Sequence, residues 1–302
     1  MTKTWDTVIV GGGAAGLFCA GVAGQLGKKV LVLDHAPVLG EKIRISGGGR
    51  CNFTNMHSSP ANFLSLNQHF VKSALARYPS SEFIKLVTAY RINYHEKHQG
   101  QLFCDDSAKQ IIEMLLGECA KGRVDVRHPV IVESVSNEGG AWIVKTNAST
   151  ERSKSIVMAT GGLPVPAIGA TAYSLDIAKQ FGLKVVDPRP ALVPLSFTSG
   201  EFDNLIELSG LSLPVRIASG SKGHRYGACR FNEDLLLTHK GLSGPAVLQA
   251  SSYWTEGEVI HIDWLGAVEA NGQFSCDELF NKEDNRLKLT ENILASVMPL
   301  RL

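Results

Sequence analysis

The chain has 302 residues, of which 44% are hydrophobic and 20% charged, and a formal net charge of +1. This length allows a large buried core and about two domains, and the composition excludes a disordered or fibrous protein. The near-neutral charge excludes a general electrostatic attraction to nucleic acid or membranes. It leaves room for a local basic patch, because residues 1–60 contain six basic and three acidic side chains.

The six cysteines are scattered and form no Cys-x-x-Cys pair. We therefore expect no zinc site, no other metal site and no redox pair, and reduced thiols fit the cytoplasm. The apolar stretch 7–23 contains three consecutive glycines, which weakens its interpretation as a signal peptide. No other run approaches the ~20 apolar residues of a membrane span. The sequence predicts a cytoplasmic protein that does not enter a membrane.

The N-terminus has the pattern of a β-α-β unit. Residues 7–10 form an apolar β-branched run that predicts a buried strand, and residues 14–26 are rich in Ala, Gly and Leu, which predicts a packed helix. Residues 29–33 predict a second buried strand, closed by Asp34. A connection of this length implies that the two strands pair in parallel.

The rest of the chain continues the mixed pattern and therefore predicts an α/β fold class. Pro188, Pro190 and Pro194 mark a boundary, after which residues 195–263 are rich in strand patterns, Gly and Ser. The elements predicted in chain order are helix over 61–90, broken at Pro79; helix over 107–119, capped by Ser107; strands within 124–146, with a hairpin turn at 137–140; strand over 155–159; helix over 174–181; and helix in 276–302.

The segment from Gly11 to Gly16 satisfies the pattern G-x-G-x-x-G between the first strand and the first helix. Gly11 permits the tight turn, Gly13 lets a pyrophosphate approach the backbone, and Gly16 lets the helix pack close to the strand. Ala14 and Ala15 present the free amide groups of the helix N-terminus to the phosphates. The motif predicts a dinucleotide site, and the alternative is a glycine turn that only packing requires.

Asp34 lies eighteen residues after Gly16, at the end of the second predicted strand. A carboxylate at this position can accept hydrogen bonds from ribose hydroxyls and would repel the 2′-phosphate of NADP. The first motif by itself does not separate FAD from NAD.

A second motif runs from Ser46 to Asn55 and contains three consecutive glycines. Successive glycine amides can form a nest for an anion, a neighbouring arginine can neutralise a pyrophosphate, and an amide side chain can bind a ring edge. The residues that we expect to contact the cofactor here are Lys42, Ser46, Gly47, Gly48, Gly49, Arg50, Cys51 and Asn52.

On these motifs the sequence resembles the BaiN/YhiN-like flavoprotein family, within the two-dinucleotide-binding-domain flavoprotein superfamily. The resemblance continues through 159–162 and 169–173 and ends with 238–245. It implies non-covalent FAD in a Rossmann-like domain (1–188), an inserted β-rich domain that covers the flavin (189–275), and the start of a helical segment (276–302). The family's chains are longer, so the resemblance also predicts that this chain is C-terminally truncated. Asp34 stands where the family more often has glutamate.

The resemblance implies an FAD-dependent oxidoreductase with NAD(P)H as electron donor. Its reaction would be hydride transfer to an electron-poor C=C bond, in a small steroid-like molecule or in a uracil base of ribosomal RNA. Two alternatives stay open. One is a catalytically silent protein that binds flavin or another dinucleotide, and the other is an NAD-only dehydrogenase, against which the second motif argues.

Several single residues have weaker interpretations. Thr160, Gly161 and Gly162 end a predicted strand, where ligands of α/β sheets gather. His239 is a candidate acid or base, although a hydrogen-bonded loop histidine is the commoner case. The segment from Gly241 to Pro245 is interpreted as a turn near the flavin. Further interpretations concern Cys51 as a packing thiol or, beside Arg50, a nucleophile; Tyr173 as a packing or pocket-lining ring; and His95 and His98 as solvated imidazoles.

Overall fold

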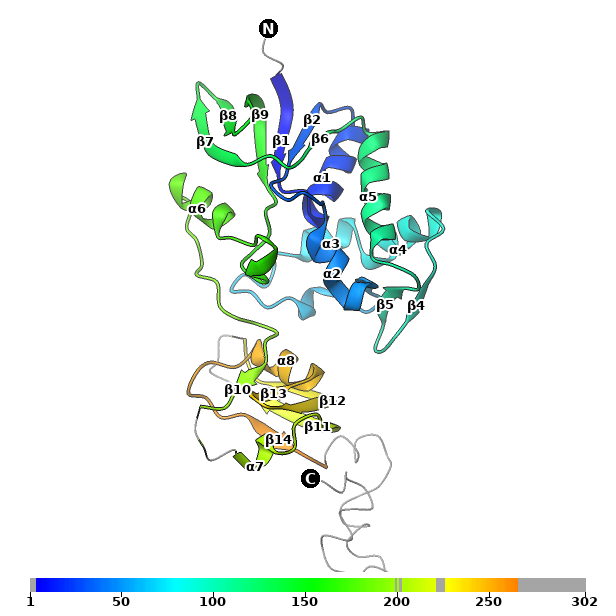
Figure 1. The fold of residues 1–302 in the computed structure, drawn as a ribbon, viewed down its shortest axis with the longest axis vertical. Coiled ribbons are helices and arrows are strands. Elements are labelled where there is room, and N and C mark those ends of the chain that lie inside the picture. Colours follow the sequence, from blue (N-terminus) through cyan, green and yellow to red (C-terminus); the bar gives the residue numbers. More distant parts are fainter. Residues whose placement is uncertain (1–3, 199, 201–202, 221–225, 266–302) are drawn as a thin grey trace, which may run out of the picture. The chain divides into compact units, whose positions relative to one another are not determined.

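The computed structural model describes residues 4–198, 200, 203–220 and 226–265. The chain divides into two units (Figure 1). Unit 1 comprises residues 1–62 and 71–186, and unit 2 comprises residues 63–70 and the described residues from 187 onward. The predicted helix in 276–302 lies outside the described residues.

Unit 1 is built on a sheet with the strand order β6-β2-β1-β9-β8-β7. Its four parallel strands are β1 (Thr4–Val10), β2 (Val30–Leu33), β6 (Asp125–Arg127) and β9 (Thr150–Met158). An antiparallel hairpin, β7 (Val132–Glu138) and β8 (Ala141–Thr146), extends the sheet beside β9. The parallel pairing of β1 with β2 and the hairpin turn at Gly139-Gly140 confirm both predictions.

Both faces of this sheet are covered, which explains the unbroken apolar runs of its central strands. Helices α1 (Ala14–Gln25) and α5 (Lys109–Lys121) pack side by side on one face (Figure 1). A second cluster on Trp5, Val8 and Leu33 includes partly buried side chains from the β6–β7 connection and from α6 (Tyr173–Gln180). The carboxyl ends of β1, β2 and β9 remain uncovered by these helices and carry the candidate site.

Smaller elements complete unit 1. They are α2 (Glu41–Ile45), the 3-10 helix Ser46–Gly49, β3 (Asn52–Asn55), the 3-10 helix Pro60–Asn62, α3 (Lys72–Arg77), α4 (Ser80–Ala89), β4 (Tyr94–Glu96), β5 (Gln101–Cys104) and the 3-10 helix Pro166–Ile168. Strands β3, β5 and β4 form a separate antiparallel sheet in that order.

Two helix predictions need correction. The helix expected over 61–90 is divided, and the described structure has no helix at residues 63–71, where Ser65 Oγ accepts a hydrogen bond from the Asn67 amide and Asn67 Oδ1 accepts one from the His69 amide. Such local side-chain bonds offer the backbone an alternative to helix. The helix predicted from Ser107 begins at Lys109, whose amide donates to Ser107 Oγ at 3.2 Å, so the start is shifted but the serine does contact the first turn.

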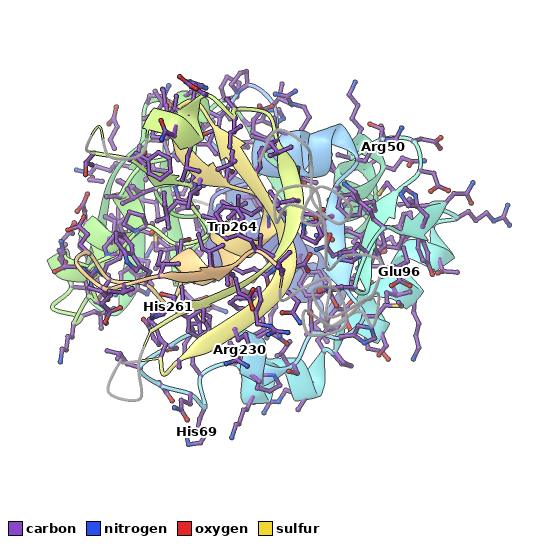
Figure 2. All side chains as sticks on the ribbon, turned by 90° about the horizontal axis from the view of Figure 1, so that it is seen from below. Arg50, His69, Glu96, Arg230, His261 and Trp264 are labelled. Atoms are coloured by element: carbon purple, nitrogen blue, oxygen red, sulfur yellow. The ribbon has the colours of Figure 1, made fainter. Side chains whose placement is uncertain are left out.

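Unit 2 contains a five-stranded antiparallel sheet with the order β10-β13-β12-β11-β14 among its described residues. The strands are β10 (Leu195–Ser196), β11 (Ser212–Ser219), β12 (Cys229–Thr238), β13 (Gly241–Ser243) and β14 (His261–Asp263), and the helices are α7 (Asp203–Ile206) and α8 (Pro245–Ser251). α8 packs on one face of the sheet through Ala246, Val247 and Ala250. Arg230 on β12 and His261 on β14, both labelled in Figure 2, are exposed. Each is a cross-strand partner of Ala218 on β11.

The turn predicted over residues 241–245 is also corrected. Gly241 to Ser243 form strand β13, and Pro245 begins α8, where a proline is well suited because the first helical N–H needs no partner. A Cβ on Gly241 would clash with the Leu195 carbonyl of the neighbouring strand. The packing of unit 2 therefore explains this glycine by itself.

Glu118 joins three helices of unit 1. Its carboxylate accepts hydrogen bonds from Tyr90 Oη (2.6 Å), Lys121 Nζ (2.7 Å) and Gln25 Nε2 (2.9 Å). Burial raises the pKa of this carboxyl, but the bonds from Lys121, Tyr90 and Gln25 outweigh burial and lower the pKa to about 2 from the ordinary 4.5. The carboxylate therefore stabilises the fold above pH 4.5, and this contribution is lost as the pH falls from about 4.5 to 2.

We expect Glu118→Gln to lower the free energy of unfolding by on the order of 2 to 3 kcal/mol at pH 7. The difference in the free energy of unfolding between the two proteins should be smaller at pH 3, because part of the stabilisation by the carboxylate is already lost at that pH. Urea unfolding of both proteins at pH 7 and pH 3 measures this difference. An equal difference at both pH values would contradict the assignment.

Candidate functional site

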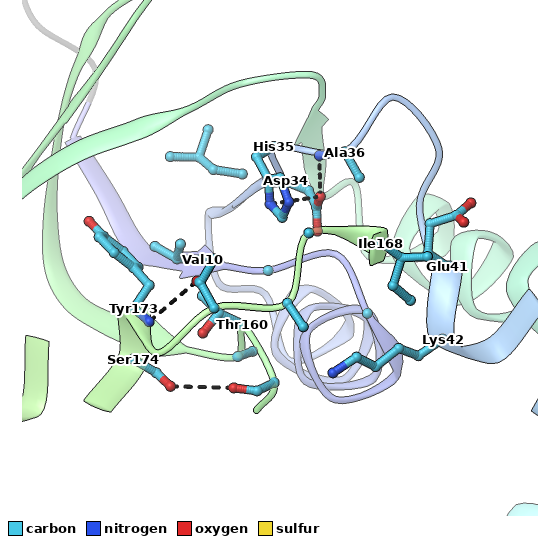
Figure 3. A pocket seen from close by; sticks show the side chains of 18 of the residues that line it. Val10, Asp34, His35, Ala36, Glu41, Lys42, Thr160, Ile168, Tyr173 and Ser174 are labelled. Atoms are coloured by element: carbon cyan, nitrogen blue, oxygen red, sulfur yellow. Dashed lines mark hydrogen bonds and ion pairs between the residues drawn. The ribbon is translucent and has the colours of Figure 1, made fainter. Parts of the chain in front are cut away.

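Unit 1 has a cavity of about 740 Å³ at the carboxyl ends of its parallel strands. Figure 3 shows side chains from the ends of β1, β2 and β9 around it. We call it the strand-end pocket, and its lining consists of residues 10–11, 13–15, 33–36, 38, 40–43, 130–132, 158–161, 168–171 and 173–174. Crevices at this edge of a doubly wound sheet are the common ligand sites of the fold class.

The glycines of the first motif differ in what surrounds them. Gly11 has a φ of +114°, and a Cβ there would clash with the Ala159 carbonyl. A Cβ on Gly16 would clash with the Gly11 carbonyl. A Cβ on Gly13 would meet no atom within 4 Å, and its φ of −85° is open to any residue. Neither packing nor backbone conformation requires glycine at position 13, whereas close approach of a ligand would.

The start of α1 is prepared for an anion. Gly13 occupies the N-cap position, and no side chain in the described part of the chain caps the helix. The amides at the N-terminus of a helix have no intrahelical partners, and the helix dipole is positive there. Gly13, Ala14 and Ala15 line the strand-end pocket, so these groups face its interior.

Asp34 follows β2 directly and lies in the strand-end pocket. One carboxylate oxygen accepts a hydrogen bond from the Gly12 amide. The other accepts one from the Ala36 amide at 2.7 Å (Figure 3). His35 Nδ1 lies 3.8 Å from the second oxygen. The carboxylate thus fixes the glycine turn, and each oxygen retains lone-pair capacity for a further donor.

Lys42 and the turn after β9 approach one another across the strand-end pocket. Lys42 Nζ donates to the Gly162 carbonyl at 2.9 Å, and Ser174 Oγ donates to the Gly161 carbonyl at 3.4 Å. The lysine therefore connects α2 to a turn 120 residues away in sequence. Thr160 and Gly161 line the pocket together with Lys42 (Figure 3).

Two buried hydroxyl groups of pocket-lining residues have no hydrogen-bond partner among the described residues, Thr160 Oγ1 and Tyr173 Oη. Buried polar atoms are nearly always paired, so each such atom calls for a partner. Tyr173 also packs against the cluster on Trp5 and Val8, so it both packs and lines the pocket, and burial raises the pKa of its phenol. Open space at Gly13 and an unpartnered hydroxyl at Thr160 fit a bound dinucleotide.

The residues of the second motif do not line the strand-end pocket, but they follow directly on α2, which does. α2 contributes Glu41, Lys42 and Ile43 to the pocket and runs into the 3-10 helix Ser46–Gly49, which we call the glycine loop. Ser46 Oγ donates to the Ile43 carbonyl at 2.7 Å, and Gly47, Gly48 and Gly49 all have positive φ. Gly48 and the side chains of Arg50 and Asn52 are exposed.

Cys51 is 5% exposed and belongs to the same core cluster as Cys104. Burial raises the pKa of its thiol, and the hydrogen bond with Ser46 opposes this only in part. A buried thiol of this kind is a poor nucleophile. The structure supports the packing interpretation of Cys51.

His239 lies exposed at the turn between β12 and β13 of unit 2. Contact of this histidine or of residues 241–245 with a cofactor stays a prediction. The described residues contain no group of three or more His, Cys, Asp or Glu side chains suited to a metal ion. They also contain no helix that is long and apolar enough to cross a membrane.

Two parts of the lining were not among the site residues predicted from the sequence. Residues 130–132 connect β6 to β7, and residues 168–171 precede α6. The first segment is held beside β2 by a backbone bond from Val130 to the Asp34 carbonyl, and no motif marks it. The second segment lies largely within residues 169–173, on which the family resemblance also rests, and a Cβ on Gly169 would clash with the ring of His35.

Comparisons with known proteins agree on one family. The family model described as the HI0933-like protein Rossmann domain matches residues 5–283. Two proteins named ribosomal RNA dihydrouridine synthase are each 44% identical to the chain. The one from Escherichia coli matches over 99% of this chain and 72% of its own length, and the one from Haemophilus influenzae over 100% and 74%. The 3-dehydro-bile acid delta(4,6)-reductase of Clostridium scindens is 22% identical over 87% of this chain and 65% of its own length.

Proposed function

The chain belongs to the HI0933-like Rossmann family and is a flavin-dependent oxidoreductase, and from this premise we propose that it reduces the C=C bond of a uracil base in ribosomal RNA, with FAD as cofactor and NAD(P)H as electron donor. The observation that carries the substrate is the 44% identity to two ribosomal RNA dihydrouridine synthases over essentially the whole chain. Such a substrate agrees with the expected cytoplasmic location.

The strand-end pocket supports FAD as the ligand. In this proposal the pyrophosphate lies against Gly13, Ala14 and Ala15, where no Cβ obstructs it and where the dipole of α1 is positive. Gly11 and Gly16 maintain the turn, and Asp34 accepts hydrogen bonds from the ribose. Thr160 Oγ1, which has no partner among the described residues, gains one from the cofactor.

The second half of the cofactor would extend along α2 to the glycine loop. Lys42, Gly161 and Gly162 form one side of this path, because the lysine holds the turn through its 2.9 Å bond to Gly162. In the proposal Ser46, Gly47, Gly48, Gly49, Arg50, Cys51 and Asn52 form the far end of the path. Bound FAD supplies hydride transfer from NAD(P)H to an electron-poor double bond, and the chain binds and orients it and excludes water.

A steroid-like substrate is the second candidate, because the bile-acid reductase also reduces a C=C bond by name. Its 22% identity over a smaller share of both chains makes it the weaker guide. The remaining alternative is a catalytically silent protein that binds FAD or another dinucleotide. Such a protein would contain the cofactor but would reduce neither a uracil base nor a steroid-like substrate.

The deciding experiment combines a spectrum with a product assay. The visible spectrum of the purified protein, with FAD added, should show bound flavin that is bleached by NADH or NADPH without oxygen. Mass spectrometry of a ribosomal RNA transcript incubated with the reduced protein should show one uridine with two added hydrogens. Bleaching without modified RNA would reject the substrate, and a bound flavin that neither nicotinamide reduces would support the silent alternative.

Lys42 provides a test of the path between the two motifs. We expect Lys42→Met to weaken FAD binding about tenfold, because a charge-assisted hydrogen bond that orders the Gly161–Gly162 turn is lost. The control is Lys72→Met, which removes an exposed lysine from α3. Fluorescence titration with FAD measures both constants, and equal affinity for the two variants would remove Lys42 from the site.

A further inference from the structure

The sequence interpreted His95 as a solvated histidine, and its side chain is exposed as expected, but the structure adds a partner at Asp105. His95 Nδ1 lies 2.7 Å from Asp105 Oδ1, and the ring is stacked on Phe103 with its plane inclined by 20°. The two side chains remain 44% and 43% exposed. The imidazole is thus held from two sides, while no hydrogen-bond partner of its other nitrogen, Nε2, is found in the part of the chain that the structure describes.

The register of the small sheet places this pair next to the glycine loop. Phe103 pairs with His95 on one side and with Asn52 of the second motif on the other. A Cβ on Gly47 would lie 2.8 Å from the Phe103 ring. His95, Phe103 and Asn52 therefore form one cross-strand row beside the loop.

The segment that carries Asp105 also holds the loop through its backbone. The Cys104 amide donates to the Arg50 carbonyl at 2.9 Å, and the Ala108 amide donates to the Gly49 carbonyl at 2.8 Å. The Asp105 amide donates to the Asn93 carbonyl at 3.0 Å, which ties the segment to the start of β4. Figure 2 shows Arg50 and Glu96, which follows His95 on β4, on the same side of the molecule.

A histidine fixed by a carboxylate and open at Nε2 is an arrangement for proton transfer. The carboxylate selects the ring orientation and accommodates the charge of the protonated ring, and Nε2 delivers the proton. An isolated exposed ion pair would be of little consequence for stability. The His95–Asp105 pair, however, lies beside the loop that is proposed to receive the reactive end of FAD. This position favours a role in catalysis over a role in stability.

Resting on the proposed function, we propose that His95 is the proton donor of the C=C reduction and that Asp105 is its positioning residue. The hydride supplied through the cofactor adds to one carbon of the double bond with both of its electrons. The π pair of the double bond takes the proton from His95 Nε2 at the other carbon. Two C–H bonds replace the π bond, NAD(P)H is the species oxidised, and His95 regains its proton from water.

The test separates the two halves of the reaction. The protein with FAD is reduced by NADPH without oxygen and mixed with the ribosomal RNA transcript in a stopped-flow instrument, and flavin reoxidation is followed. We expect His95→Gln to slow reoxidation by the RNA about 100-fold or more and to leave reduction by NADPH unchanged, because that step requires no proton from His95. Asp105→Asn should slow the same step, and the double variant should be no slower than His95→Gln.

Two further measurements keep a structural effect apart from a chemical one. His98→Gln, which replaces a histidine of the connection that follows β4, is the matched control and should react as the unsubstituted protein does. Addition of the transcript to protein without FAD should shift the imidazole NMR resonances of His95 and not those of His98. Reoxidation of His95→Gln at the unsubstituted rate would overturn the inference alone, whereas an unsubstituted protein that RNA fails to reoxidise would overturn the proposed function and the inference with it.

Discussion

Gly13→Asp should abolish retention of FAD without unfolding the protein. A carboxylate placed against the pyrophosphate costs about 4 kcal/mol for unit charges about 4 Å apart near a protein surface, which corresponds to a roughly 1000-fold weaker affinity. The fold should tolerate the change, because a Cβ at this position meets no atom within 4 Å and the backbone is in an ordinary extended conformation. Aspartate is also a favourable N-cap, so the protein without FAD should be as stable as before or slightly more stable.

Gly11→Val is the matched comparison, two residues earlier in the same turn. Its Cβ would clash with the Ala159 carbonyl, and a φ of +114° is strained for valine. We expect this variant to lose stability with or without FAD, whereas Gly13→Asp loses only the cofactor. Thermal unfolding and a flavin spectrum of each variant distinguish the two results. Full FAD retention by Gly13→Asp would show that the ligand does not lie against α1.

Glu151→Ala should cause the largest loss of stability among the substitutions away from the pocket. Glu151 is 8% exposed, and its carboxylate accepts hydrogen bonds from Trp5 Nε1 (2.7 Å), Arg127 Nη1 (2.6 Å) and Ser149 Oγ (2.8 Å). Burial raises the pKa of this carboxyl, but the bonds from Trp5, Ser149 and Arg127 outweigh burial and lower the pKa. The group is therefore charged at neutral pH and joins β9 to β1 and β6.

We expect Glu151→Ala to lower the free energy of unfolding by about 2 to 4 kcal/mol, somewhat less than for a fully buried pair because Arg127 is partly exposed and keeps Asp125 as a partner. Glu133→Ala, an exposed glutamate on β7 of the same sheet, should change it by less than about 0.5 kcal/mol. Urea unfolding at neutral pH measures both. Equal stability of the two variants would mean that the buried carboxylate contributes no more than a surface one.

The elements predicted well are those whose information is local. The first strand, the glycine turn and α1 follow from a β-branched run, the spacing of three glycines and an Ala-rich stretch, all within the first 26 residues. The helix expected over 61–90 failed over residues 63–71, where local side-chain bonds of Ser65 and Asn67 compete with helix. The turn expected over 241–245 failed because a three-residue strand leaves too short a pattern to recognise.

The candidate site was predicted only where local motifs mark its residues. Asp34, Lys42 and Thr160 were singled out, and all three line the strand-end pocket. Residues 130–132 were not, because they reach the pocket only through the pairing of β6 with β2. The His95–Asp105 pair depends on the register of β4 against β5, which a sequence without a two-residue turn signal leaves open.

The sequence by itself determined the β-α-β unit and its dinucleotide motif, because both depend on residues close together in the chain, and it indicated the family through motifs distributed along the chain. The tertiary structure decided which segments meet: the turn at Gly162 with Lys42, Asp105 with His95, and Glu151 with Trp5 and Arg127. These contacts join residues 10 to 146 positions apart. Their formation depends on strand order and register, which the burial of the whole core selects and no local pattern encodes.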